Sequence, residues 1–199
     1  MSAPRAASLA TRELILNHAL RLAAAGGLPA ASIGALASAT GMAKSGVFLH
    51  FGSKPALDEA LVQTASARFE RAVVTATAAA PGGVARLVAL SEAWLELTAA
   101  RDAALDVLAA GCPPLRVAPR DALGTWHRGW RALLLEHAAG AAAAGELPAA
   151  TRADVIAFEI DALLRGAWHD TADGDASAVA RARYAIEHAL RRWAAAEAP

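Results

Sequence analysis

The chain has 199 residues, long enough for one sizeable core or for two small domains, and its 19 Lys and Arg residues are balanced by 19 Asp and Glu residues. This balance excludes binding to nucleic acid through net charge alone, so any such affinity must come from a local patch. The single cysteine and the lack of a signal-peptide core or an uninterrupted apolar span predict a soluble, cytoplasmic protein without disulfides.

Alanine and leucine dominate the sequence and apolar residues recur at helical spacing, which predicts an all-α fold. The first helices are expected over Thr11 to Gly26, Ser32 to Gly41, Ala43 to Phe51 and Lys54 to Ala80. After a break at residues 81–83, further helices are expected over about 84–100, 103–110, 120–143, 151–169 and 177–196. Short helices are therefore expected to precede a bundle of longer ones.

Residue types at the helix ends support these boundaries. Ser32 and Ser53 can act as N-caps of the second and fourth helices, because a serine side-chain oxygen accepts from amides of the first turn. Gly41 is expected to end the second helix. The apolar face of the third helix is expected to consist of Val47, Phe48 and Phe51.

The last two helices are expected to form a homodimer interface. The final helix carries an apolar stripe at helical spacing, made of Val179, Ala182, Ile186, Leu190 and Trp193. Arg183, Glu187 and Arg191 follow one another at intervals of four on another side of the helix.

Two short helices joined by a glycine turn form the layout of a helix-turn-helix, whose second helix enters the DNA major groove. The exposed side of this second helix is expected to carry small, hydrogen-bonding and cationic residues: Lys44, Ser45, Gly46, Leu49 and His50. A solvated helix face is the alternative, but such a face would normally also carry acids. None occurs between Glu13 and Asp58, and an acid-free segment is compatible with a phosphate backbone.

The sequence resembles the TetR family of bacterial transcriptional repressors. The matching residues, in order and at the expected spacing, are Ser32, Leu36-Ala37, Gly41-Met42-Ala43, Phe48-Leu49-His50-Phe51 and Ser53-Lys54. The clear resemblance covers residues 11 to about 62, and the remainder matches in layout. It implies a three-helix DNA-binding domain over 1–60 and a helical ligand-binding and dimerisation domain over 61–199. The implied function is a ligand-responsive repressor that binds a palindromic operator as a homodimer.

The resemblance also implies which residues contact DNA: Ser32, Lys44, Ser45, Gly46, Phe48, His50 and Lys54. Lys54 would grip a phosphate together with the amides of its helix N-terminus, while Ser32 and His50 would contact the backbone. Ser45 and Gly46 would face bases. Phe48 replaces a tyrosine whose hydroxyl commonly reaches phosphate in the family, so we expect that hydrogen bond to be absent. Ala43 replaces the family's usual serine cap.

A small-molecule effector site is expected in the second domain. Its candidate residues are Trp94, Cys112, Trp126, His127 and Trp130. A role in core packing explains the tryptophans equally well. Cys112 is better explained as a small buried residue than as a redox sensor. Because only Arg128 and Arg131 offer strong cationic anchors nearby, we expect a mostly hydrophobic or aromatic ligand.

An all-helical small-molecule-binding protein or enzyme without DNA binding is the alternative function. A carboxylate-bridged metal enzyme would need Glu-x-x-His pairs on facing helices, and the sequence has none. The acidic segment 170–175 lacks the ligand spacing of a calcium loop and is better explained by helix capping. We therefore expect no metal, no cofactor and no enzymatic activity. A helical adaptor would leave the acid-free segment unexplained.

Overall fold

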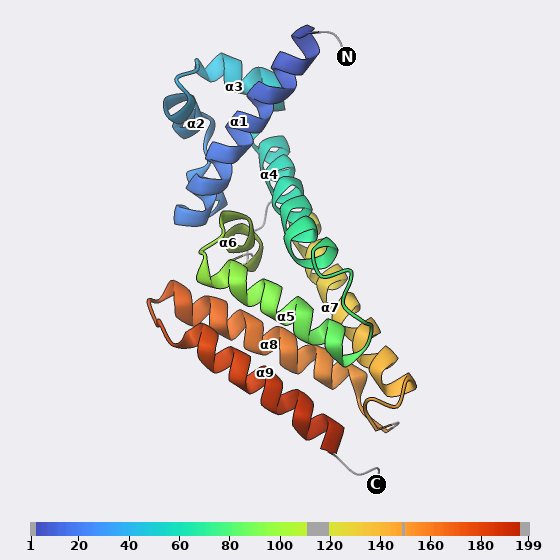
Figure 1. Cartoon of the computed structure of the whole chain (residues 1–199). Helices are drawn as coiled ribbons and strands as arrows, with labels where there is room; N and C mark the ends of the chain where they lie inside the picture. Colours follow the sequence, from blue (N-terminus) through green and yellow to red (C-terminus); the bar gives the residue numbers. More distant parts are fainter. Residues whose placement is uncertain (1–2, 111–119, 149, 196–199) are drawn as a thin grey trace. The chain divides into compact units, whose positions relative to one another are not determined.

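The computed structural model describes residues 3–110, 120–148 and 150–195, and over these residues the chain is helical without β-strands (Figure 1). The predicted all-α fold is thus confirmed. The chain forms two compact units. Unit 1 comprises Met1–Arg68 and Ala103–Thr125, and unit 2 comprises Phe69–Asp102 and Trp126–Pro199.

Unit 1 is built on the long helix α1 (Ala3–Gly26), which packs against α2 (Ile33–Thr40) and α6 (Ala103–Ala109). A short 3-10 turn, η1 (Leu28–Ala30), joins α1 to α2, and α3 (Lys44–Phe51) and α4 (Lys54–Phe69) follow. The core side of α1 consists of apolar residues at helical spacing: Ile15, Leu16, Ala19, Leu20 and Ala23.

The turn between α2 and α3 is fixed by local hydrogen bonds. Ser32 Oγ accepts from the amide of Ala35 at 3.1 Å and caps α2, as predicted. Gly41 ends α2 at φ +68°, a left-handed conformation that side chains disfavour, and the Met42 amide donates to the Ala37 carbonyl at 3.1 Å. Chain reversal within three residues brings α2 and α3 into contact.

Ser53 caps α4, as predicted, because its Oγ accepts from the Ala56 amide at 3.2 Å. Two helix boundaries differ from the expectation. Helix α1 begins at Ala3 rather than near Thr11, since the alanine-rich residues before Thr11 favour helix. Helix α4 ends at Phe69, where a π-helical segment, η2 (Glu70–Thr75), replaces the predicted α-helical continuation.

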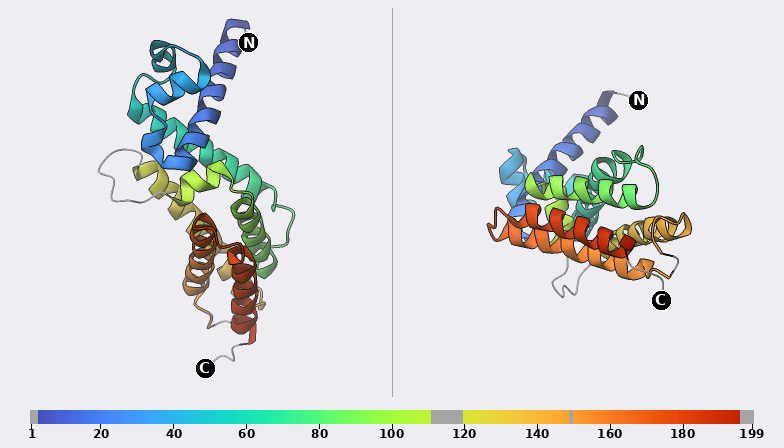
Figure 2. Two further views of the ribbon diagram at one scale, coloured as in Figure 1. Left: turned by 90° about the vertical axis from the view of Figure 1, so that its left-hand side faces the viewer. Right: turned by 60° about the horizontal axis from the view of Figure 1, so that its bottom comes forward.

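Unit 2 consists of η2, α5 (Val84–Ala99), α8 (Ala153–Ala172), α9 (Ala178–Ala195) and most of α7 (Arg120–Ala143). Helices α8 and α9 lie side by side and antiparallel, and α5 packs against both (Figures 1 and 2). Their common core contains Leu87, Leu90, Ile156, Ile160, Leu164, Ala182, Ile186 and Leu190. These helices agree with the predicted ranges to within three residues.

Two long-range contacts fix the entry into α5. The Arg86 guanidinium is buried and donates to the carbonyl oxygens of Val74, at 2.9 Å, and Thr77. Glu146 caps the N-terminus of α5 by accepting from the Val84 amide at 2.8 Å. A Cβ at residue 83 would lie 2.4 Å from the Glu146 carboxylate, so Gly83 permits this contact. In the described part of the chain, the helices are too short or too polar to cross a membrane.

Candidate functional site

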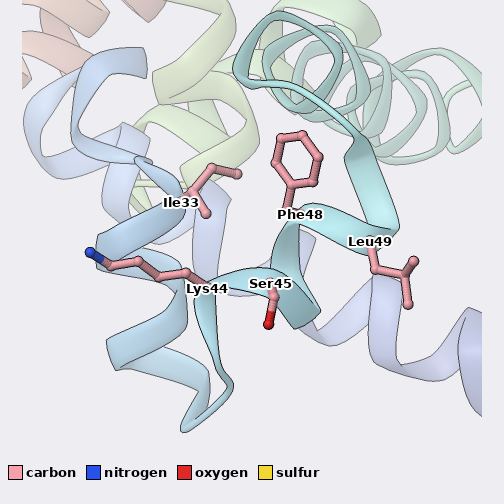
Figure 3. A pocket seen from close by; sticks show the side chains of 5 residues that line it. All are labelled: Ile33, Lys44, Ser45, Phe48 and Leu49. Carbon is pink, nitrogen blue, oxygen red and sulfur yellow. The ribbon is translucent and has the colours of Figure 1, made fainter.

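The exposed face of α3 is formed by Lys44, Ser45, Phe48 and Leu49 (Figure 3). These positions recur at intervals of three and four, so their side chains lie on one side of the helix. Val47 and Phe51 point to the opposite side and are buried. The face is therefore polar in its first turn and apolar in its second.

Phe48 differs from the expectation that it packs with Val47 and Phe51. Its side chain is 53% exposed, and that of Leu49 is 85% exposed. The helix period explains this difference: Val47 and Phe51 are four residues apart and share a face, from which Phe48 is rotated by about 100°. Val47 and Phe51 therefore pack into the core of unit 1, and Phe48 lies at the surface.

Lys44 and Ser32 converge on Gly34 of α2. A Cβ built on Gly34 would lie 3.6 Å from Lys44 Cε, 4.0 Å from Lys44 Nζ and 3.9 Å from Ser32 Oγ. Because Ser32 Oγ accepts from the Ala35 amide, the hydroxyl retains its own hydrogen for donation. An ammonium, a hydroxyl and the N-terminal turn of α2 thus lie together, which is the donor set of a phosphate site.

Gly46 and His50 lie at the edges of the exposed face and are half-buried. A Cβ at residue 46 would approach Met42 Cε to 3.3 Å, so a larger residue there would press on the turn between α2 and α3. The His50 ring lies 6.4 Å from that of Phe51, measured between centroids. On the other side, the Arg12 guanidinium of α1 covers the Phe51 ring at 5.0 Å.

Lys54 makes two contacts inside unit 1. Its Nζ donates to the Leu28 carbonyl of η1 at 2.9 Å and forms an ion pair with Asp58, one turn further along α4. Both side chains of the pair are partly or largely buried. Lys54 therefore ties η1 to the start of α4, a structural role that the spacing of the two lysines does not reveal.

A shallow groove of about 360 Å³ runs along α3. Its walls are Ile33, Lys44, Ser45, Phe48 and Leu49 (Figure 3). Ile33, the first residue of α2, is half-buried and reaches the groove. Four of these five residues come from the exposed face of α3, so the groove and that face are one surface.

In unit 2, the predicted ligand residues Trp94, Trp126 and Trp130 form one aromatic cluster around Phe69. The centroid of the Phe69 ring lies 5.3, 5.1 and 5.4 Å from theirs, each edge-on. Phe69 was not predicted as part of this site, because its position in the apolar pattern of α4 was its only signal. Trp94 is fully buried with 0% exposure, so it serves as core.

A cavity of about 300 Å³ adjoins this cluster. It is lined by Phe69, Glu70, Val74, Trp126, Gly129, Trp130 and Leu133. Among the described residues, the buried indole N–H groups of Trp94 and Trp130 have no hydrogen-bond partner. Such groups are rare in folded proteins, because an unpaired buried donor loses its hydration without compensation.

His127 is not among the residues that line the cavity. The His127 ring packs on Trp126 at 4.9 Å between centroids, and His127 Nε2 lies 3.3 Å from the Arg165 guanidinium. Cys112 lies outside the described residues. The structure therefore brings the tryptophans together and assigns His127 a contact with α8.

The acidic segment before α9 acts as a cap, as predicted. Asp175 Oδ1 accepts from the amide and hydroxyl of Ser177 at 2.8 and 2.7 Å, and Arg181 bridges Asp175 and Asp170. The hydrogen bonds from Ser177, followed by those from Arg181, lower the pKa of Asp175 from 3.8 to about 2. Across the described ranges, His, Cys, Asp and Glu side chains form no group that could hold a metal ion.

The sequence matches the models of two protein domain families. Residues 15–61 match the model of bacterial regulatory proteins of the tetR family, and residues 83–186 match that of the tetracyclin repressor-like C-terminal domain. No curated protein sequence matches. The first match contains the whole exposed face of α3, and the second contains Trp94, Trp126 and Trp130.

Solved structures resemble the fold over most of the chain. A TetR-family regulator from Cytophaga hutchinsonii has a TM-score of 0.77 at 18% identity, covering 96% of this chain and 98% of its own. A TetR regulator from Chloroflexus aurantiacus has a TM-score of 0.76 at 22% identity, covering 94% and 93%. AibR in complex with isovaleryl coenzyme A and operator DNA has a TM-score of 0.70 at 21% identity, covering 79% and 85%.

Proposed function

Since the chain belongs to the TetR family of bacterial regulatory proteins, and is thus a DNA-binding transcriptional regulator rather than an enzyme, we propose a specific mode of action. The protein is a repressor that binds a palindromic operator as a homodimer. A small hydrophobic or aromatic effector releases it from DNA. Residues 1–60 form the DNA-binding domain and residues 61–199 the regulatory and dimerisation domain.

The exposed face of α3 is the observation that carries the proposal. It presents Lys44 and Ser45 beside an apolar second turn, and residues 14–57 around it contain no acid. A helix face of this kind can approach the polyanionic duplex without charge repulsion. We therefore place α3 in the major groove, with Ser45 and Gly46 facing base edges.

Phosphate contacts hold this face in register. Lys44 and Ser32 converge beside Gly34 and together donate hydrogen bonds to one phosphate at the start of α2. Lys54 at the start of α4 and His50 at the end of α3 contact the backbone further along. To contact a phosphate, the Lys54 ammonium must either bind Asp58 and a phosphate oxygen at the same time or leave the Asp58 carboxylate for the phosphate oxygen.

The dimer is formed by α8 and α9. The predicted stripe residues Ala182, Ile186 and Leu190 are buried within the protomer, so the contact uses other side chains. Phe158 is 58% exposed and Tyr184 is 71% exposed on these helices, and such large apolar surface commonly marks an interface. A two-fold dimer requires a two-fold site, with half-sites about 34 Å apart.

The effector binds the cavity beside the aromatic cluster. Its lining is mainly aromatic and aliphatic, which favours a ligand of the same character. Trp130 lines this cavity, and its partnerless indole N–H offers a donor to an acceptor group on that ligand. The AibR complex, which contains isovaleryl coenzyme A and operator DNA, is a precedent for an organic ligand on this fold.

Selection of bound duplexes from a random library tests the function. We expect a palindromic sequence to be enriched, and genes beside its genomic copies to suggest effectors for screening. A screened effector should lower operator affinity. If no duplex is enriched while the folded protein still binds small molecules, the chain is a ligand-binding protein without DNA binding, and the proposal is wrong.

A further inference from the structure

Two large apolar side chains stand on the face of α3 that we assign to DNA. Leu49 is 85% exposed and Phe48 is 53% exposed, although helices of this size usually direct such residues inward. They are adjacent, they line one groove with Ile33, and both lie one helical turn beyond Lys44 and Ser45 (Figure 3). If α3 contacted only polar base edges and phosphates, the apolar side chains of its second turn would have no partner on the DNA.

The major groove offers one apolar group, the C5-methyl group of thymine. The amino, carbonyl and ring-nitrogen groups that distinguish the base pairs there are hydrogen-bond donors or acceptors, which an apolar side chain would desolvate without replacement. A methyl group is the partner that gains from contact with Leu49 or Phe48, since burial of apolar surface is favourable.

We propose that Phe48 and Leu49 are specificity-determining residues that read thymine methyl groups in each operator half-site. This inference rests on the proposed DNA-binding function and adds to it the base that the second turn of α3 selects. Lys44 and Ser45, one turn earlier, contact the neighbouring base pair or its phosphate. Each half-site therefore contains a thymine beside the position that Ser45 reads.

The surroundings of the two side chains favour DNA over a protein as the occupant. Lys44 flanks the groove, and no acid lies between Glu13 and Asp58 in the sequence, so the surface suits a polyanion. Ser32 and Lys44 converge beside the same groove and can fix a phosphate next to it. An apolar protein partner would need none of these donors.

Deoxyuridine in place of thymine gives a direct test, because it removes the methyl group and keeps the Watson–Crick edge. The operator selected by the wild-type protein is synthesised with each thymine replaced in both half-sites, and affinities are measured at one salt concentration. At one or two positions per half-site we expect affinity to fall by about fourfold per methyl group, or about 15-fold for a symmetric pair.

Side-chain variants then assign the methyl contact. Leu49→Ala or Phe48→Ala should bind the thymine and deoxyuridine operators equally at the position that each side chain reads, which is the signature of a coupled pair. Leu49→Met keeps an apolar side chain and should retain the preference. Ser45→Ala is the matched control from the same face, and it should change affinity without removing the deoxyuridine effect.

The outcomes separate this inference from the proposed function. A wild-type protein that selects an operator but tolerates every deoxyuridine overturns methyl reading and leaves DNA binding intact. A deoxyuridine effect that persists in both alanine variants also overturns it. If no duplex is selected, the proposed function fails and this inference fails with it. Circular dichroism of Leu49→Ala should match the wild type, because this side chain lies outside the core.

Discussion

The Lys54 ammonium donates a hydrogen bond to the backbone carbonyl of Leu28, 26 residues earlier in the chain, at 2.9 Å. The same ammonium pairs with Asp58, so it is held in place before any DNA arrives. A cation fixed at the N-terminus of α4 loses less conformational entropy on meeting a phosphate than a mobile one.

Replacement of Lys54 by alanine should weaken binding to every duplex, because a phosphate contact carries no sequence information. The plot of log affinity against log salt should flatten by about one unit for each phosphate that the variant no longer neutralises, counting both subunits. Titrations by fluorescence anisotropy at several salt concentrations measure this slope. Asp58→Asn is the matched control: its amide oxygen can still accept from the Lys54 ammonium and hold it in place, while the competing negative charge is removed, so affinity should be preserved or raised. A Lys54→Ala protein with unchanged affinity and slope would contradict the phosphate contact.

Ala43 begins α3 in an extended conformation but offers no side-chain oxygen to the first-turn amides. Ala43→Ser or Ala43→Thr should therefore stabilise unit 1 by about 1 kcal/mol, the usual contribution of an N-cap. Urea unfolding monitored by circular dichroism measures the change. Ala43→Val resembles threonine in shape without its hydroxyl and should give no such gain. Equal stability of the threonine and valine variants would show that the cap does not form.

Phe158→Asp should convert the dimer to monomers, because it places a charge on the apolar surface of α8. Light scattering coupled to size-exclusion chromatography at micromolar protein gives the mass directly. Leu135→Asp on α7 is the matched control, since Leu135 is also an exposed apolar side chain but lies outside α8 and α9. A wild-type protein that is monomeric under these conditions excludes the proposed interface.

Trp130→Phe should weaken effector binding about fivefold, the usual contribution of one aromatic contact, because Trp130 lines the cavity. Trp94→Phe should also weaken it by changing the cluster against which Trp130 packs. Calorimetric titration of an effector found by screening measures both constants. Operator affinity without effector should stay at the wild-type value. Normal effector binding by both variants would place the site elsewhere.

The carboxyl group of Asp175 should titrate with a pKa of about 2, below its ordinary 3.8, because Ser177 and Arg181 hydrogen-bond to its charged form. A lowered pKa means that Asp175 stabilises the fold above the unfolded-state pKa, and this contribution disappears as the pH falls from about 3.8 toward 2. Carboxyl-carbon NMR measures the titration. Ser177→Ala and Arg181→Gln should each raise the value, whereas an unchanged value in both would exclude this cause.

Local patterns predicted most of the fold, and long-range packing decided the rest. Ser32, Gly41 and Ser53 act within a few residues of their own positions, so the helix ends that they set were predictable. The contact of Lys54 with Leu28 spans 26 residues and has no local signal. The exposure of Phe48 depends on which side of α3 packs against the core. Its aromatic character alone led to the wrong prediction that it would be buried.

The aromatic cluster was likewise predictable in part from the sequence and in part only from the three-dimensional structure. Tryptophans at helical spacing on α5 and α7 predicted their common neighbourhood. Phe69 at its centre lies where α4 gives way to the π-helical segment, whose sequence ERAVVT contains no proline or glycine and so predicted an uninterrupted α-helix. A π-helical turn depends on one additional residue in the backbone spiral rather than on a distinctive side chain, so the composition did not reveal it.

The spacing of the indole rings gives unit 2 a shared optical character. Trp94 lies 5.9 Å from Trp126 and 5.0 Å from Trp130 between centroids, with the ring planes inclined by 28° and 33°. Chromophores this close exchange excitation energy before they emit light, so the fluorescence of the three indole rings is coupled. A molecule that quenches one of these rings therefore lowers the fluorescence of all three. Ligand binding in the adjoining cavity can thus be followed by the intrinsic tryptophan fluorescence of the unlabelled protein.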